Sequence, residues 1–225
     1  MVTNLAYFYE TSRKVRGGKW VWVKDSNGEQ RNNVLLGGTI LNPKKDFDHL
    51  YAAQLVEYKP GVGCLIFRSF GVKTATTAAT DTTIYINGDG LSDVPEVGML
   101  IMKAPSAATG TGQSALVTNV VYDETNERFA VTLSVALGAL AVGDILVEAA
   151  GDAADDDATV LVSNPNTFVE ADRDLMPTEG YGLTGEANYS ISTVYNKQAW
   201  IARMQPLPAY VLANNRSRID GIFWI

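Results

Sequence analysis

Apolar and polar residues alternate with a period of two in segment after segment of this chain, and the helical period of 3.6 does not recur. Successive side chains of a strand point to opposite faces of a sheet, so this alternation predicts half-buried strands. The strongest example is residues 189–195. The length of 225 residues fits one large all-β domain or two small ones. The expected fold class is therefore all-β.

Hairpins are expected where a turn separates two such segments. Three are predicted, joining residues 20–23 to 33–36, 53–58 to 64–68, and 116–122 to 129–133. Asn27-Gly28 marks the first turn and Pro60-Gly61 marks the second. For the start of the second hairpin, a helix over residues 48–58 is the alternative. Further strands are expected at residues 84–86, 97–102, 144–147 and 167–170.

The formal net charge of −7 is distributed unevenly along the chain. Residues 1–75 have a net charge of +5, residues 76–160 have −11, and residues 161–225 have −1. Aromatic residues follow the same division, with 10, 3 and 8 in these segments. Such an asymmetry concerns partners and solubility rather than the fold. It indicates a base made by the two ends of the chain, from which an acidic module projects.

Two low-complexity stretches lie at the limits of the acidic segment. Residues 73–83 contain no large apolar side chain, and residues 151–159 consist mainly of Ala and Asp. Neither stretch can fill a core, so both are expected to be exposed joints. We therefore expect a base domain of residues 1–74 and 161–225. Residues 75–160 are expected to form an inserted, projecting β domain, either a small β-barrel or a β-sandwich.

The acidic segment contains a weak internal similarity. Residues 97–102 (Val-Gly-Met-Leu-Ile-Met) resemble residues 142–147 (Val-Gly-Asp-Ile-Leu-Val), and each segment follows a short apolar strand. Two similar strand–loop–strand units would give a pseudo-symmetric barrel or sandwich. Chance similarity between two valine-rich strands that follow a turn glycine is the alternative.

No catalytic centre is expected. The single histidine, His49, has no accompanying nucleophile motif, and the single cysteine, Cys64, lies in an expected strand as a small buried hydrophobe. One Cys and one His cannot form a multi-residue zinc site. Acidic residues at 87–93 and 155–157 offer oxygen ligands for calcium, but they depart from the EF-hand pattern and also fit an acidic turn and an acidic linker. We predict no enzyme, no cofactor and no metal.

A basic run near the N-terminus and an apolar C-terminus form the candidate contact surface. Its residues are Arg13, Lys14, Arg16, Lys19, Trp20, Trp22, Phe223, Trp224 and Ile225. Burying a large apolar side chain is worth roughly 1.5–3 kcal/mol, so the C-terminal residues are expected to pack into their own domain, a second subunit or a partner. The negative net charge argues against nucleic acid as a partner. No apolar run is long enough for a membrane span, and no signal peptide is recognised.

Three features together resemble a family of virion proteins. They are the segment Leu36-Gly37-Gly38-Thr39-Ile40-Leu41-Asn42-Pro43, the Ala/Thr-rich acidic block, and the aromatic, Arg-containing tail at residues 216–225. The composition is similar to that of capsid-associated proteins of tailed bacteriophages, of the head-fibre, decoration or auxiliary capsid type, especially those of crAss-like phages. The resemblance implies a non-catalytic, oligomeric protein, with a trimer favoured. It also implies synthesis in the host cytoplasm and attachment to the major capsid protein on the outer face of the capsid.

Two other roles fit the sequence. A carbohydrate-binding or adhesin-like β module would also project an acidic β domain into solvent. A tail-tube or joining protein would form rings through the same apolar C-terminus.

Overall fold

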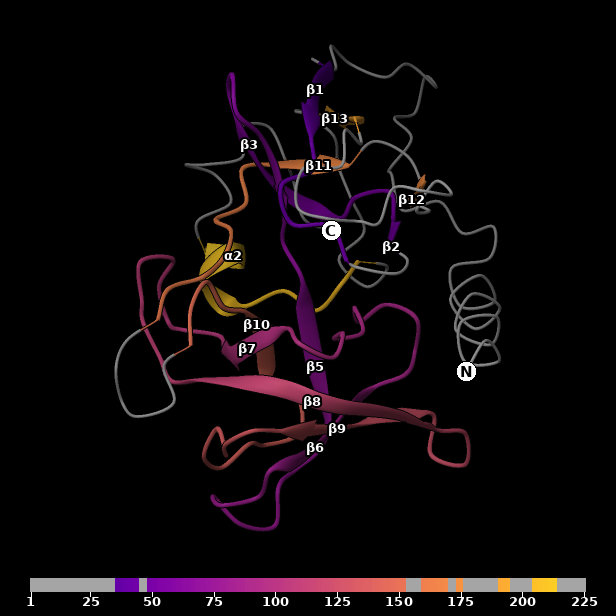
Figure 1. Ribbon diagram of the computed structural model, residues 1–225, viewed down its shortest axis with the longest axis vertical. Helices are drawn as coiled ribbons and strands as arrows, with labels where there is room; N and C mark the ends of the chain where they lie inside the picture. The colour runs from indigo at the N-terminus through magenta and orange to yellow at the C-terminus, as the bar shows by residue number, and fades with distance from the viewer. Residues whose placement is uncertain are drawn as a thin grey trace. The chain divides into compact units, whose positions relative to one another are not determined.

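The computed structural model describes residues 35–44, 48–152, 159–169, 173–175, 190–194 and 204–213 (Figure 1). These residues contain thirteen strands and one short helix, α2 (Ala209–Ala213), so the all-β prediction is confirmed. The chain divides into two compact units. One contains Arg68–Val162 with Gln205–Tyr210, and the other contains Trp20–Phe67 with Ser163–Met204. In the sequence, Arg68–Val162 of the first unit lies between Phe67 and Ser163 of the second.

The first unit is a closed barrel of six antiparallel strands. They are β5 (Ser69–Thr74), β6 (Thr83–Asn87), β7 (Leu100–Lys103), β8 (Ser114–Asp123), β9 (Arg128–Leu133) and β10 (Ile145–Glu148). Around the ring the order is β10-β5-β6-β9-β8-β7, so no strand of the barrel has a free edge. Of the two expected forms, the barrel is the one observed. It includes β5, which lies before the domain start expected at residue 75.

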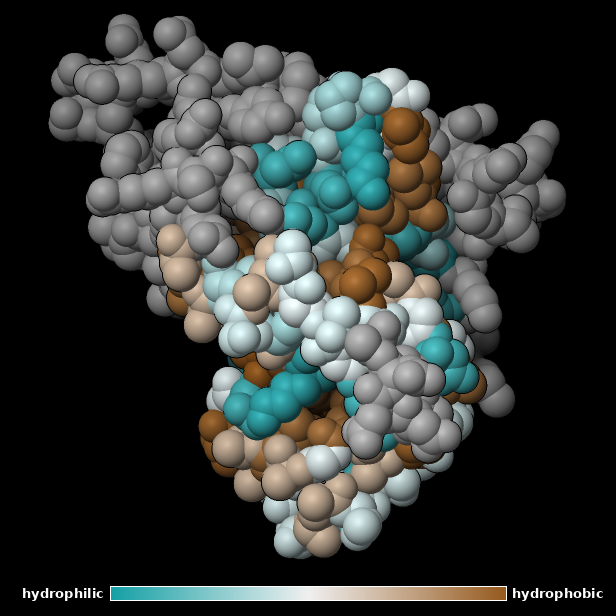
Figure 2. Space-filling view, turned by 90° about the vertical axis from the view of Figure 1, so that its left-hand side faces the viewer, coloured by the Kyte–Doolittle hydropathy of each residue, from teal (hydrophilic) through white to brown (hydrophobic). Residues whose placement is uncertain are grey.

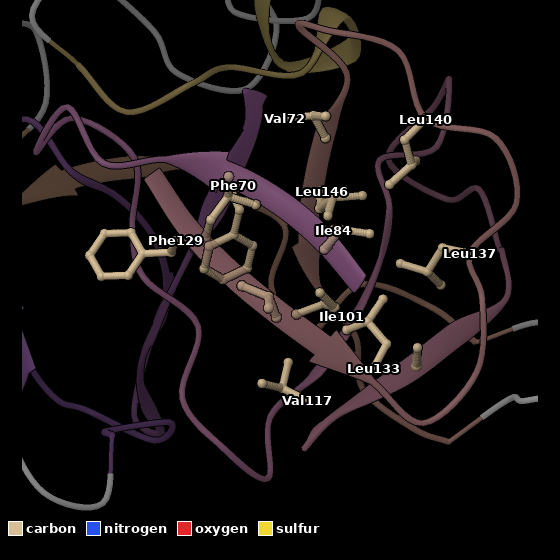
Figure 3. Packing of buried hydrophobic residues seen from close by; sticks show 13 residues of the cluster. Phe70, Val72, Ile84, Ile101, Val117, Phe129, Leu133, Leu137, Leu140 and Leu146 are labelled. Carbon is tan, nitrogen blue, oxygen red and sulfur yellow. The ribbon is translucent and has the colours of Figure 1, made fainter. Parts of the chain in front are cut away.

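The barrel encloses an apolar core. Figure 3 shows most of its labelled side chains gathered inside the ring, with Phe129 at one side and with Leu137 and Leu140 coming from the loop between β9 and β10. The inward residues alternate along the strands, as in β9, where Phe129, Val131 and Leu133 are buried and the residues between them are half-buried. The predicted hairpin of residues 116–122 and 129–133 is confirmed as the β8–β9 pair. Alternation alone was sufficient here because one face of each strand is buried.

Two turns of the same type precede β7 and β10. Their third positions are Gly98 (φ 94°) and Gly143 (φ 87°), and in each turn the fourth N–H donates to the first carbonyl, as in a type II turn. Each glycine N–H also donates to a neighbouring strand, Gly98 to Val117 of β8 and Gly143 to Val72 of β5. A register irregularity follows Val72 in β5 and Val117 in β8. The two halves of the barrel therefore share local geometry.

The strand registers follow the same symmetry. Ser69 of β5 pairs with Val147 of β10, and Ser114 of β8 pairs with Met102 of β7. Where β7 meets β10, Met102 pairs with Val147. These two residues are each other's counterparts in the two halves. A two-fold rotation that exchanges β5, β6 and β7 with β8, β9 and β10 thus reproduces the pairing pattern. We call two positions equivalent when this rotation relates them. Residues 97–102 and 142–147, which have similar sequences, occupy equivalent positions.

The second unit contains a five-stranded antiparallel sheet with the order β1-β13-β11-β3-β4. Its strands are β1 (Leu35–Thr39), β13 (Ser190–Val194), β11 (Thr167–Val169), β3 (Leu55–Lys59) and β4 (Gly63–Ile66). Ile40, just after β1, forms a parallel bridge with Cys64 of β4, so the two ends of the sheet approach each other. Two short strands, β2 (Asp48–Leu50) and β12 (Arg173–Leu175), form a separate pair.

The predicted hairpin around Pro60-Gly61 is confirmed as the β3–β4 pair. Gly61 has φ 74° and the N–H of Val62 donates to the carbonyl of Lys59 at 3.0 Å, which is a type II turn with Pro at its second position. The alternative helix over residues 48–58 is wrong, because this range contains β2 and most of β3. Of the first predicted hairpin, residues 20–23 lie outside the described residues.

Two asparagine side chains hold loops of the second unit to strand backbones. Asn42 accepts a hydrogen bond from the N–H of Ile66 at 2.7 Å and donates to its carbonyl at 3.0 Å. Asn166 does the same with Tyr58, at 2.8 and 3.0 Å. An amide side chain offers one acceptor and two donors, so it can satisfy both backbone groups of a residue that a strand would otherwise pair. Asn42 and Asn166, each next to a proline in the sequence, thus take the place of a strand partner for Ile66 and Tyr58.

Candidate interaction surface

The contact residues predicted from the sequence, which are Arg13, Lys14, Arg16, Lys19, Trp20, Trp22, Phe223, Trp224 and Ile225, all lie outside the described residues. Residues 153–158, which are most of the joint expected at residues 151–159, lie outside them too. What the structure places is the acidic side of the predicted arrangement, namely the barrel. Its charged and apolar surface groups are therefore the candidate interaction surface.

The acidic segment of residues 76–160 has only two cations, Lys103 and Arg128. Lys103 Nζ lies 2.7 Å from Oδ2 of Asp144, and Arg128 Nε lies 2.9 Å from Oδ2 of Asp123. Both cations are thus paired with carboxylates of the barrel itself. Of the other carboxylates, Glu148 pairs with Arg68 at 2.7 Å, whereas Glu124 and Glu127 are exposed.

The carboxylate of Asp144 is held in its charged form. Burial raises its pKa, but hydrogen bonds from the Lys103 ammonium and the N–H of Ala141 outweigh burial, so the pKa lies below the usual 3.8. Asp144 is also the fourth residue of the turn that contains Gly143. The ion pair therefore ties β7 to the turn before β10.

The tip of the β8–β9 hairpin is preorganised. Asp123 accepts hydrogen bonds from the backbone N–H and side-chain amide of Asn126, at 3.2 and 2.8 Å, and from Arg128. These bonds, the Asn126 side chain first, hold the pKa of Asp123 below its usual value. Glu127 adopts φ 47°, which non-glycine residues rarely do, and Gly88 donates to its carbonyl at 3.0 Å.

Gly88 is required for this contact. A Cβ at Gly88 would lie 2.8 Å from both the Glu127 carbonyl oxygen and the Tyr122 ring. The hairpin extends beyond its counterpart, since β8 has ten residues and the equivalent strand β5 has six. Figure 1 shows β8 as the longest arrow of the barrel. Glu124 and Glu127 are exposed at the tip, so a fixed loop presents two carboxylates to solvent.

Exposed apolar side chains on the barrel are scattered. They are Val97, Leu116, Val121, Val142 and Val160, with exposures between 36% and 68%. Figure 2 shows, on one face of the molecule, brown apolar groups interspersed with pale and teal groups. Single exposed valines are ordinary on a protein surface. The apolar groups alone therefore do not define a site.

The two halves of the barrel differ on their outer faces. Gly71 of β5 and Leu116 of β8 are equivalent, since they pair with Ile145 and Leu100 at matching registers. A Cβ at Gly71 would lie 3.3 Å from Pro206 Cγ, so this face is covered by the segment that follows Met204. Leu116 is 36% exposed. At this position the first half thus packs against Pro206, whereas the second half has a partly exposed side chain.

One face of the Tyr85 ring is covered by a cation of the barrel. The Arg128 guanidinium lies 3.8 Å from the centre of its ring, and Arg128 Nη1 also donates to Thr74 Oγ1 at 3.0 Å. Stacking on an exposed ring is a common way to bind sugars and nucleobases, and here the cation occupies that position. Tyr122, the other tyrosine of the barrel strands, packs on Phe129 with ring centroids 4.8 Å apart.

The carboxylates of the turn after β6 bind backbone groups. Asp89 accepts from the N–H groups of Leu91 and Ser92, and Asp93 accepts from the N–H of Ser69 at 3.2 Å. Within the part of the chain that the structure describes, no group of three His, Cys, Asp or Glu side chains is placed to hold a metal ion. Residues 155–157, the other calcium candidates, lie outside that part.

The single histidine and the single cysteine of the chain lie in the second unit. Cys64 is fully buried, and burial raises its pKa to about 11, so it remains a thiol at neutral pH. His49 lies in β2, opposite Asp174 of β12. Cys64 pairs with Tyr58 in the β3–β4 hairpin, in the strand position that the sequence indicated.

No model of a known protein family matches the chain, and no curated protein matches it. Among the described residues, no helix has the length and hydrophobicity needed to cross a bilayer.

Proposed function

We propose that this chain is a structural virion protein that binds the outer face of a bacteriophage capsid lattice, as a decoration, auxiliary or head-fibre component. The base attaches to the capsid, and the barrel projects from it. The partners are the major capsid protein and further copies of the chain, with a trimer favoured.

One observation supports this assignment of base and projection. The segment with net charge −11 supplies five of the six strands of a ring without free edges, and both of its cations are paired with carboxylates of the same segment. Strand addition at a sheet edge is a common way for β proteins to associate, and a closed barrel does not offer it. The basic residues that would meet an acidic lattice belong to residues 1–75, outside the acidic segment.

The test is co-sedimentation of the full chain with capsids that lack it, across a series of salt concentrations. Charge reversal at Arg13, Lys14 and Arg16 should slow association and reduce its salt dependence, because complementary charges steer encounter. Exposed ion pairs contribute only about 0.2–1 kcal/mol each. Trp20→Ala, or removal of residues 223–225, should therefore weaken attachment more, because buried aromatic groups dominate binding energy.

The control is a matched change on the barrel. Glu124→Lys and Glu127→Lys alter exposed charges at the hairpin tip and should leave capsid attachment unchanged. If these two substitutions abolish attachment while the base substitutions leave it intact, the barrel is the attachment site and the assignment is reversed. If the full chain does not co-sediment with capsids at any salt concentration, the proposed function is wrong.

A further inference from the structure

The third strand of each half-barrel pairs with the other half. We define the first half as Arg68–Ala104 and the second as Gln113–Ala149. In the ring, β7 of the first half lies between β8 and β10, and β10 of the second half lies between β5 and β7. Neither third strand pairs with the hairpin of its own half. Each half thus consists of a strand hairpin and a third strand, which we call its arm. The arm of each half pairs with strands of the other half.

We propose that the barrel is an internally duplicated, arm-exchanged pseudo-dimer, in which each half is a module that binds a second copy of itself. The registers carry this inference, because each strand pairing between the halves has an equivalent pairing. Ile84 pairs with Val131 where the hairpins meet, and Met102 pairs with Val147 where the arms meet. In each of these pairs, the rotation exchanges one partner for the other.

The ends of the halves are equivalent as well. The N–H of Ala104 donates to the carbonyl of Ile145 at 2.8 Å, and the N–H of Ala149 donates to the carbonyl of Leu100 at 2.9 Å. Residues 105–112 connect the end of the first half to the start of the second. The same eight residues can therefore span from Ala149 back to Arg68.

Side chains have diverged mainly where the halves meet different surroundings. Arg68 pairs with Glu148, and the equivalent positions hold Gln113 and Lys103. Gly71 lies beneath Pro206, whereas its equivalent Leu116 is exposed. Ser69 and Ser114 are equivalent and identical, and each has its hydroxyl bonded to a segment outside the strands, at Gln205 and Gly151 respectively.

The experiment exchanges the two halves within the full chain. The order becomes Phe67, then residues 113–149, then 105–112, then 68–104, and then Ala150, so that no residue is added or lost. Each new joint lies at a position equivalent to an original one, and the exchange turns the barrel by half a rotation relative to the flanking chain. We expect one cooperative unfolding transition, with a midpoint lowered by less than about 10 °C.

A second variant accounts for the difference at Gly71. The exchange moves Leu116 beneath Pro206, to the place that Gly71 occupies in the original chain. The exchanged chain that also contains Leu116→Gly should therefore unfold at a higher midpoint temperature than the exchanged chain alone. A control chain of the same composition moves residues 68–88 to follow Ala149, which places its joints at non-equivalent positions, and it should lose the cooperative transition. If the exchanged chain and its Leu116→Gly form both unfold without cooperativity, as the control does, the halves are not equivalent modules and the inference is wrong.

Discussion

Arg68 donates a hydrogen bond to Glu148 Oε2 over 2.7 Å, and the two side chains are 1% and 15% exposed. Arg68 directly precedes β5, and Glu148 is the last residue of β10, the strand that pairs with β5. A buried ion pair adds little net stability, but removal of one partner leaves an uncompensated charge.

Glu148→Gln should therefore cost more than Arg68→Met. The first substitution leaves the guanidinium, the more buried group, without this carboxylate, and a loss of about 3–5 kcal/mol is expected. Arg68→Met leaves a carboxylate that still contacts water. Urea denaturation of both variants shows which one loses more free energy of unfolding. Equal losses, or a larger loss for Arg68→Met, would contradict this explanation.

Gly143→Ala should destabilise the barrel by about 1–2 kcal/mol, because φ 87° is unfavourable for a residue with a Cβ. No atom lies within 4 Å of the new Cβ, so the cost comes from the backbone alone. The control is Gly151→Ala, whose Cβ would make an ordinary contact at 3.5 Å with Thr159 Oγ1. Thermal unfolding of both variants tests the prediction, which fails if the two midpoints coincide.

The ion pair between Asp144 and Lys103 should give the barrel an acid-dependent stability. Because the pKa of Asp144 is lowered by folding, its contribution is complete above the unfolded pKa of about 3.9 and disappears as the pH falls through the folded value. Both side chains are partly exposed, so about 0.2–1 kcal/mol is expected. Asp144→Asn should reduce the pH dependence of the free energy of unfolding below about pH 4. Glu124→Gln, at the exposed hairpin tip, should change that profile less.

Asn166→Ala should destabilise the second unit by about 1–2 kcal/mol, since it removes two hydrogen bonds to the backbone of Tyr58. Asn164→Ala is the matched control, because Asn164 uses its backbone N–H to bond Glu57, and alanine retains that group. Chemical denaturation compares the two variants. A loss for Asn164→Ala as large as that for Asn166→Ala would show that the loop, and not the amide, is responsible.

Cys64 should resist thiol reagents in the folded protein. Its side chain is fully buried and its pKa is raised to about 11, so little thiolate exists at about pH 8. Labelling by a chromogenic disulfide should begin only when denaturant unfolds the sheet. Rapid labelling of the native protein would show that the β4 strand opens locally.

Local patterns of the sequence were enough for several elements of the fold. Alternation predicted the strands that became β6, β8 and β9, because a strand with one buried face must place apolar residues at every second position. Pro60-Gly61 predicted the β3–β4 turn, because Pro and Gly provide the two dihedral angles that a type II turn requires. The charge of each segment also follows directly from the residues.

Contacts between distant residues required the tertiary structure. From the sequence, residues 69–74 were assigned to the end of the base, but they pair with β10, more than 70 positions away. A fragment limited to residues 75–160 would therefore lack β5 and leave the ring open. Six similar positions could not separate a repeat from chance, whereas the matching registers of Met102 and Val147 establish a two-fold arrangement. Sequence periodicity reports which face of a strand is buried. Only the fold decides which strand lies next to it, because pairing partners are chosen by packing and closure across the whole barrel.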